Sequence, residues 1–147
     1  MFKKILVATD ASDSSTRALD VAFALAAELD AELLIIHVIR DMQLPSEIKE
    51  IPELESFHNT REDIMRQVAE SVLNKARSRA KKGGVKKVES AIGTGDPATS
   101  IVGFAKRRKI DLIVVGTRGL GKLKSMVLGS VSRKVTNNAE TSCLIVR

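Results

Sequence analysis

The sequence predicts a single α/β domain, in which a five-stranded parallel sheet carries helices on both of its faces. Five short apolar runs alternate along the chain with four segments of helical periodicity. Runs that are apolar throughout are typical of parallel strands, because the crossover helices bury both faces of such a sheet. A length of 147 residues suits one domain with one core. We therefore expect the domain to span residues 1–147.

The first apolar run, residues 4–9, is rich in branched side chains and predicts a buried strand. Residues 10–16 are polar and offer several candidates for the N-cap of a helix. The following segment predicts an amphipathic helix with these apolar residues on its inward face: Ala18, Val21, Ala22, Leu25 and Leu29. The second run, residues 32–39, completes a strand–helix–strand unit whose crossover should be right-handed.

Residues 40–57 interrupt this pattern with two prolines and several acids, and they predict a long surface loop. A long helix follows, which should end near Lys82 because Gly83 and Gly84 come next and suit a left-handed C-cap. The inward face of this helix is predicted from apolar residues spaced by four: Ile64, Val68, Val72 and Ala76.

Three further strands are predicted at residues 85–92, 111–115 and 142–146. Asp96 followed by Pro97 predicts the start of the helix between the first two of them, with proline at the first helical position. The apolar face of that helix comprises Ala98, Ile101, Val102 and Ala105. The last helix should run to about residue 138, with these residues turned inward: Leu128, Val131 and Val135.

The composition argues against several classes of protein. No apolar stretch approaches the roughly 18 residues that cross a bilayer. The opening residues are strand-like and lack the pattern of a signal peptide. The single cysteine, Cys143, cannot form an internal disulfide, which fits a reducing compartment. We therefore expect a cytoplasmic protein with no membrane partner, in which Cys143 is an inert core residue.

The formal net charge of +6 could serve nucleic acid or any ligand that carries phosphate. Much of the charge is local, at residues 81–82, 86–87 and 106–109, and two of these clusters fall at predicted helix C-termini, where cations complement the helix dipole. Proteins that bind single strands stack bases on aromatic side chains, and this chain has four Phe but no Trp or Tyr. Nucleic acid is therefore a minor alternative to a solvated charged surface.

Residues 116–131 carry the clearest chemical signal. They follow a strand and lead into a helix start, where free backbone N–H groups favour an anion. Glycines allow the backbone to approach phosphate oxygens closely, because no Cβ intervenes. We interpret the segment as a phosphate-binding loop. It contains four glycines, a serine and three cations: Gly116, Gly119, Gly121, Gly129, Ser130, Arg118, Lys122 and Lys124.

Two familiar nucleotide motifs fit poorly. Residues 116–122 have the spacing of a Walker A loop, but Leu123 stands where that loop needs Ser or Thr to hold magnesium. Residues 93–98 approximate a dinucleotide fingerprint, but they follow the third strand, and Asp96 would repel a pyrophosphate. A turn and a helix cap explain the second segment better.

The glycine spacing resembles the ATP-binding signature of the universal stress protein family. The resemblance extends over the whole chain and is loosest at residues 40–57. It rests on the Gly-x2-Gly-x9-Gly-Ser pattern of Gly116, Gly119, Gly129 and Ser130, on the opening run 3–10, on His37-Val38, on residues 111–117 and on the closing run 143–146. It implies a Rossmann-like, nucleotide-binding fold.

The resemblance also implies a role for each matched position. Ala8, Thr9 and Asp10 would line the adenosine end, with the Asp10 carboxylate accepting a hydrogen bond from a ribose hydroxyl. Val38 would meet adenine through its backbone. The phosphates would be surrounded by Gly116, Thr117, Arg118, Gly119, Gly121, Lys122, Gly129, Ser130 and Val131. The ligand would be ATP, or ADP or AMP, with Mg²⁺ held mainly by the phosphates. From the residues alone, Asp10 could instead be only the N-cap of the first helix.

The resemblance implies a nucleotide-dependent switch in stress response or signalling, often a homodimer through the C-terminal strand, with a protein partner that the sequence does not identify. The loop comes without a readable general base, which favours a switch over a fast enzyme. A slow ATPase or autophosphorylating enzyme on the same loop is the alternative. A scaffold without ligand is disfavoured, because four loop glycines cost backbone entropy for no packing gain.

No catalytic or metal-binding residues are assigned from the sequence, because no Ser-His-Asp grouping or metal-ligand spacing can be assembled. His37 is expected to be a packed histidine within its strand. The hydroxyls of the loop could accept a phosphate, although simple hydrogen bonding is the favoured role for them: Thr117, Ser125, Ser130 and Ser132.

Overall fold

The structure is a computed structural model that describes residues 1–41, 46–49, 51–117 and 128–147. Its elements follow in the order β1 (Lys4–Ala8), α1 (Asp13–Leu29), β2 (Glu32–Ile39), α2 (Ser46–Lys49), α3 (Pro52–Lys82), β3 (Val88–Thr94), α4 (Pro97–Arg108), β4 (Leu112–Gly116), α5 (Ser130–Asn138) and β5 (Ser142–Val146). The strands form one parallel sheet in the order β3-β2-β1-β4-β5. The predicted α/β fold is confirmed.

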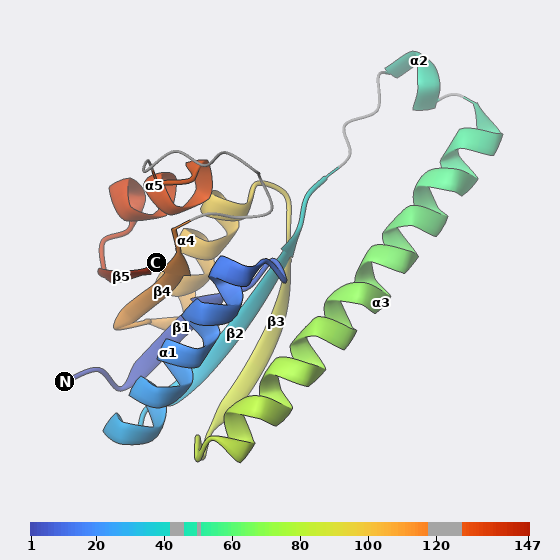
Figure 1. The fold of residues 1–147 in the computed structure, drawn as a ribbon. Helices are drawn as coiled ribbons and strands as arrows, with labels where there is room; N and C mark the ends of the chain where they lie inside the picture. The colour runs from blue at the N-terminus through green and yellow to red at the C-terminus, as the bar shows by residue number, and fades with distance from the viewer. Residues whose placement is uncertain (42–45, 50, 118–127) are drawn as a thin grey trace.

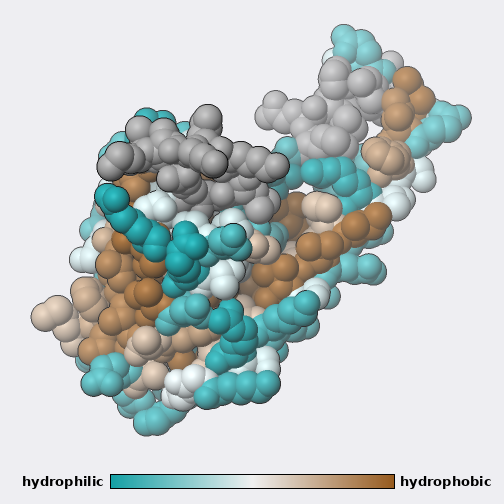
Figure 2. All heavy atoms as spheres, in the orientation of Figure 1, coloured by the Kyte–Doolittle hydropathy of each residue, from teal (hydrophilic) through white to brown (hydrophobic). Residues whose placement is uncertain are grey.

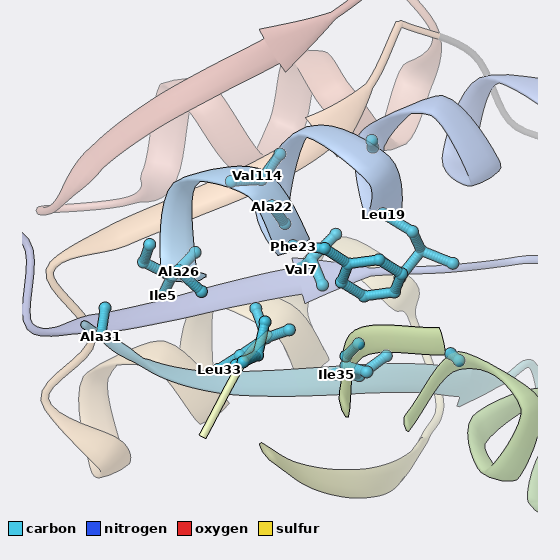
Figure 3. Close-up of a cluster of buried hydrophobic side chains, with 14 of the residues drawn as sticks. Ile5, Val7, Leu19, Ala22, Phe23, Ala26, Ala31, Leu33, Ile35 and Val114 are labelled. Atoms are coloured by element: carbon cyan, nitrogen blue, oxygen red, sulfur yellow. The ribbon is translucent and has the colours of Figure 1, made fainter. Parts of the chain in front are cut away.

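Helices cover both faces of the sheet, with α1 and α3 on one side and α4 and α5 on the other (Figure 1). Successive residues of β1 therefore enter different cores. Ile5 and Val7 belong to the core beneath α1 and α3 (Figure 3), whereas Leu6 belongs to the core beneath α4 and α5. None of these three side chains is exposed at all. This double burial explains why the strands are apolar throughout.

The predicted strands match the observed ones within one residue, except for the third. Strand β3 begins at Val88 and not at Val85, because the residues before it are used to end α3. Gly84 takes the left-handed conformation, with φ +92, while Gly83 has an ordinary φ of −79. The N–H of Val85 then bonds to the carbonyl of Ala80, and Val85 is buried although it lies outside the strand.

Helix α1 packs on the sheet with a face slightly rotated from the predicted one. Ala18 and Ala22 are fully buried as expected, but Leu29 is 43% exposed, so its predicted inward position is wrong. Leu29 lies in the last turn, next to Asp30, whose left-handed conformation ends the helix. The buried face also includes Leu19, Phe23 and Ala26.

Helix α3 begins at Pro52, well inside the segment 40–57 that the sequence predicts as loop. Proline is tolerated at this first helical position, because the first N–H of a helix has no intrahelical partner in any case. Glu53 and Glu55 follow in the first turn, where carboxylates complement the helix dipole. The short helix α2 also lies inside the predicted loop.

The predicted inward face of α3 is mostly wrong. The residues of α3 that are buried are Ala69, Leu73, Ala76 and Ala80, so Ala76 is the one correct member of the predicted set. Ile64 is 50% exposed and Val68 is 46% exposed. The first half of α3 runs past the edge of the sheet, as Figure 1 shows, and reaches only the ends of β2 and β3, at Ile39 and Thr94.

Mutation can distinguish the buried residues of α3 from the exposed ones. Leu73→Ala should lower the free energy of unfolding by about 2–5 kcal/mol, because it leaves a cavity against the sheet. Ile64→Ala, measured on the monomer, should change it by no more than about 0.5 kcal/mol. Urea denaturation followed by circular dichroism would measure both. Equal losses would mean that residue 64 is packed after all.

The start of α4 is as predicted. The side chain of Asp96 accepts hydrogen bonds from the backbone N–H of Thr99 at 3.0 Å and from its hydroxyl at 2.8 Å. These bonds favour the carboxylate and hold the pKa of Asp96 below its usual value. At the other end of α4, the last turn carries Lys106, Arg107 and Arg108, which confirms the dipole complement expected there.

The loss of stability on removing the Asp96 cap should depend on pH. Because the folded-state pKa of Asp96 is lowered, its stabilising effect is present above the unfolded-state pKa of about 3.9 and is lost as pH falls through the folded-state pKa. Asp96→Ala should cost about 1 kcal/mol at pH 7, and the difference from wild type should shrink below about pH 4. Asp96→Asn, which caps without titrating, is the control. Urea midpoints from pH 7 to pH 2 would show this convergence or its absence.

Candidate functional site

The order of the strands in the sheet reverses at β1. Strands β2 and β3 extend the sheet on one side of β1, whereas β4 and β5 extend it on the other side. In open parallel sheets, ligands bind outside the carboxyl ends of the strands at this switch point. Here the residues that follow β1 are Thr9 and Asp10, and those at the end of β4 are Gly116 and Thr117. The sequence predicts all four as site residues.

Thr9 is 5% exposed and is held by hydrogen bonds from several directions. Its N–H donates to the carbonyl of Ile36 at 2.9 Å, and its hydroxyl lies 3.2 Å from the Ser15 hydroxyl. Its carbonyl lies 2.9 Å from Nδ1 of His37, so that this nitrogen is the donor. His37 is thus a half-buried, hydrogen-bonded histidine, which agrees with its predicted packing role. Thr9 fixes the backbone from which Asp10 projects.

Asp10 is not the cap of α1. That role belongs to Ser12, whose hydroxyl accepts the N–H of Ser15 at 3.2 Å. Oδ1 of Asp10 accepts the N–H of Ser12 at 3.0 Å across Ala11, which has a positive φ of 66. Among the described residues, no group hydrogen-bonds to Oδ2 of Asp10, and this carboxylate is only half-buried. One oxygen therefore holds the turn while the other can accept from a ligand.

Gly116 allows the end of β4 to lie directly against the first turn of α1. A Cβ at this position would collide with the Ser14 hydroxyl and would lie 2.8 Å from the carbonyl carbon and oxygen of Ser14. The Gly116 carbonyl accepts a hydrogen bond from Ser132, which is buried. The glycine at position 116 is thus required by packing, a role that the sequence does not reveal. The favoured prediction of simple hydrogen bonding holds for Ser132.

The N-terminus of α5 lies next to this strand end. The N–H of Gly129 donates to the carbonyl of Thr117 at 2.7 Å, which brings the start of the helix to the end of β4. Gly129 is the N-cap and supplies no side-chain hydrogen bond, in contrast to Ser12 of α1 and Asp96 of α4. Ser130 is exposed. Uncapped N–H groups beside an exposed hydroxyl form an arrangement that suits an anion.

Two further predicted site residues lie at the ends of neighbouring strands. Ala8 ends β1 and pairs with Ile36 of β2, so β2 continues past it and carries Val38 beyond the end of β1. Val38 and Val131 are both half-buried and pack against the core beneath α4 and α5. Val38 and Val131 thus place apolar side chains next to the polar groups at the switch point.

Several predicted site residues lie outside the part of the chain that the structure describes. They are Arg118, Gly119, Gly121 and Lys122, together with Leu123, Lys124 and Ser125 of the same loop. The described residues thus bring together Ala8, Thr9, Asp10, Val38, Gly116, Thr117, Gly129, Ser130 and Val131 at the carboxyl edge of one sheet.

Sequence reasoning missed a charged cleft beyond the ends of β2 and β3. One wall is made by Ile39, Arg40, Asp41 and Thr94, and the other by Arg61, Glu62 and Arg66 of α3. Within the described residues, none of the three arginines lies in ion-pair distance of a carboxylate. The sequence holds no signal for this cleft. Its two walls come from the ends of β2 and β3 and from α3, which are separate elements in the sequence.

No metal centre is formed by the residues described, since no three His, Cys, Asp or Glu side chains gather there to hold an ion. Cys143 is half-buried in β5, and burial raises the pKa of its thiol. In the ranges with described coordinates, no helix is both long and apolar enough to span a bilayer.

The geometry defines a class: an α/β protein with a parallel sheet and a candidate ligand site at its switch point. The model of the universal stress protein family matches residues 1–147. Universal stress protein YxiE of Bacillus subtilis is 40% identical over 151 residues, covering 100% of both chains. Universal stress protein MJ0531 of Methanocaldococcus jannaschii is 36% identical over 147 residues, covering 100% of this chain and 83% of the relative. The chain belongs to the universal stress protein family.

Solved structures show the same fold. Protein MJ0577 superposes with a TM-score of 0.85 at 30% identity, covering 99% of this chain and 96% of that one. A universal stress protein in complex with cAMP gives a TM-score of 0.70 at 31% identity, covering 99% and 97%. UspA from Lactobacillus plantarum has a TM-score of 0.89 at 24% identity, over 99% and 98% of the chains, and shares the fold. One similar protein thus holds a nucleotide.

The packing role of Gly116 can be tested directly. Gly116→Ala should lower the free energy of unfolding by about 1–3 kcal/mol, because the new methyl group meets the Ser14 main chain. Gly83→Ala is the matched control: its φ is ordinary, and its Cβ would lie 3.4 Å from the nearest atoms. Thermal or urea unfolding would measure both. Equal stabilities would contradict the close approach of β4 and α1.

Proposed function

We propose that this protein binds ATP at the switch point of its sheet and acts as a nucleotide-dependent switch in stress response or signalling. The observation that carries the proposal is the pairing of an uncapped helix start, Gly129–Ser130, with the available carboxylate oxygen of Asp10 on the adjacent strand end. A similar protein has been solved with cAMP, which supports an adenine nucleotide as the ligand class.

The strand order suggests how the nucleotide would lie. Strand β1 separates β2 from β4, and two strand spacings amount to about 10 Å, a distance that a nucleotide spans. Adenine would meet the backbone of Val38 and the end of β1 at Ala8 and Thr9. The ribose would donate a hydroxyl hydrogen bond to Asp10. The phosphates would lie toward β4 and the start of α5.

The phosphate end would draw on several groups. These are the N–H groups of Ser130 and Val131, the hydroxyls of Thr117 and Ser130, and the loop residues Gly116, Arg118, Gly119, Gly121, Lys122 and Gly129. The described residues form no cluster of carboxylates for a divalent ion. Mg²⁺ would accordingly be held mainly by the phosphates, whose charge it would neutralise.

A switch explains this constellation better than a fast enzyme. In the proposed pose Asp10 lies at the ribose, away from the terminal phosphate, and Ser132 is committed to the Gly116 carbonyl. Neither would then act as a general base on the terminal phosphate. The alternative is a slow ATPase or autophosphorylating enzyme on the same loop, and the exposed hydroxyl of Ser130 at the phosphate end favours it.

The assembly and location belong to the same proposal. Strand β5 forms one edge of the sheet and pairs with β4 alone, and its residues from Cys143 to Val146 are half-buried. We expect a homodimer through this C-terminal strand region, a cytoplasmic location and a protein partner that responds to the nucleotide state.

The proposal is tested first by denaturing the purified protein and identifying any nucleotide that it releases. Calorimetric titration with ATP and Mg²⁺ follows, for wild type and Gly129→Val. At φ −58 and ψ 160 valine does not strain the backbone, so loss of binding with an unchanged melting temperature would report on the phosphate site. Phosphate release above background would favour the enzyme. No binding of ATP, ADP or AMP would refute the proposal.

Two substitutions separate the ligand role of Asp10 from its turn role. Asp10→Asn keeps an oxygen to accept the Ser12 N–H but offers an amide where the ribose hydroxyl needs an acceptor. It should weaken ATP binding roughly ten- to hundredfold with little change in stability. Asp10→Ala should lose both affinity and some stability. Unchanged affinity in both variants, measured by calorimetry, would remove Asp10 from the site.

A further inference from the structure

Within the residues that the structure describes, the first half of α3 contributes no buried side chain to the core of the protomer. The whole helix has 31 residues, which is about 46 Å, whereas the longest strand, β2, has 8 residues, or about 26 Å. The first buried residue of α3 is Ala69. We call residues 52–68 the arm; it rises past the carboxyl edge of the sheet in Figure 1. In proteins most of the stability of a helix comes from the packing of an apolar face, so an exposed apolar face on the arm calls for an explanation.

The arm carries a row of apolar side chains, which we call the arm stripe. It consists of Ile51, just before the helix, and Leu54, Phe57, Ile64 and Val68. Within the helix, intervals of three, seven and four residues keep Leu54, Phe57, Ile64 and Val68 on one side. Four of them are strongly exposed: Ile51 43%, Phe57 64%, Ile64 50% and Val68 46%. Figure 2 shows apolar surface along α3, bordered by polar residues.

The protomer cannot cover this stripe with its own sheet. Val68 is 46% exposed while the next residue, Ala69, is fully buried, so the stripe and the packed face point in different directions. Turning the stripe toward the sheet would lift Ala69 and Leu73 out of the core. Among the described residues, nothing covers Phe57, Ile64 and Val68.

We propose that the arm pairs with the arm of a second copy of this chain, as an antiparallel two-helix contact. The stripe is nearly symmetric about residue 59: Leu54 and Ile64 each lie five positions from it, and Ile51 and Val68 lie eight and nine positions away. A two-fold contact requires this self-complementarity, because residue i must meet j while j meets i. Ile51 then meets Val68 of the other copy, and Leu54 meets Ile64.

Arg61 selects the antiparallel orientation. It lies between Phe57 and Ile64 along the helix, two positions from residue 59 on the side opposite Phe57, at the border between the arm stripe and the cleft whose wall it also lines. Antiparallel pairing therefore places Arg61 against Phe57, where a guanidinium on an aromatic face is favourable. Parallel pairing would instead oppose two Arg61 side chains of like charge. The pairing ends where the arm meets Ala69, so the packed halves of the two helices lie at opposite ends of the pair.

The contact is of modest size. Seventeen residues of helix amount to about 26 Å, and two such helices bury on the order of 1,000 Å², the lower limit for a specific interface. The association should therefore be reversible and depend on concentration. It uses a surface separate from β5 and requires no nucleotide, so the two proposals succeed or fail independently. If both contacts form, the assembly contains more than two chains.

Sedimentation velocity on the full chain, from about 1 to about 100 µM, tests the contact. Wild type should show a reversible association step. Phe57→Glu combined with Ile64→Glu should remove that step without lowering the melting temperature, because neither residue is buried in the protomer. Leu29→Glu, at a side chain of similar exposure on α1, should leave it intact. A wild type that stays monomeric, or an association step that survives in the arm variant, would overturn the proposal.

Spin-label distances test the orientation. Labels would be attached to Thr60→Cys or Ser71→Cys, both exposed positions, in a Cys143→Ser background. In an antiparallel pair the two labels at 60 lie close together beside the arm stripe, whereas those at 71 are separated along the axis by about 36 Å, at 1.5 Å per residue. The short distance at 60 should vanish with Ile64→Glu. Two short distances would indicate parallel arms, and a short distance at 60 that persists in Ile64→Glu would show that the arm stripe does not hold the arms together.

Discussion

The burial of β1 is the constraint on which the rest of the structure depends. Ile5, Leu6 and Val7 are inaccessible to solvent on both faces, and the strand is hydrogen-bonded to β2 on one edge and β4 on the other. A strand this deeply buried needs two helical layers and a neighbouring strand on each edge. Because β1 is the first strand, both neighbours follow it in the chain, which must cross back over β1 to form the second of them. Both the layers and the switch point thus follow from it. The polar residues immediately after β1 are in consequence the first that can meet a ligand.

Ordinary hydrogen bonds and one close backbone approach hold the candidate site in place. Thr9 and Ser15 fix the turn after β1, and Gly116 lets the first turn of α1 lie against the end of β4. Each of these contacts leaves something unsatisfied nearby: an oxygen of Asp10 and the uncapped start of α5. Satisfied scaffold groups next to unsatisfied ones are expected of a preorganised binding site, because the scaffold then does not rearrange when ligand arrives.

Much of the fold could be predicted from the sequence, since apolar runs and the Asp96-Pro97 cap act locally. The site region could be placed for a similar reason: strand ends and glycines are visible along the chain. What could not be predicted depends on partners distant in sequence. Periodicity gives α3 two apolar rows, and only the sheet decides that Leu73 is buried while Ile64 is not. Likewise, the reason for glycine at position 116 is Ser14, which no local pattern reveals.

The division of α3 into a packed half and the arm has a consequence for how the sequence can change. Substitutions between residues 52 and 68 touch no core side chain, so the domain tolerates them as long as the helix persists. Substitutions beyond Ala69 are constrained by the sheet. In a single continuous helix, the sequence of the packed half is therefore constrained by folding, whereas the sequence of the arm can diverge. Related chains that share this fold could acquire different pairing preferences within one cell while keeping the same ligand site.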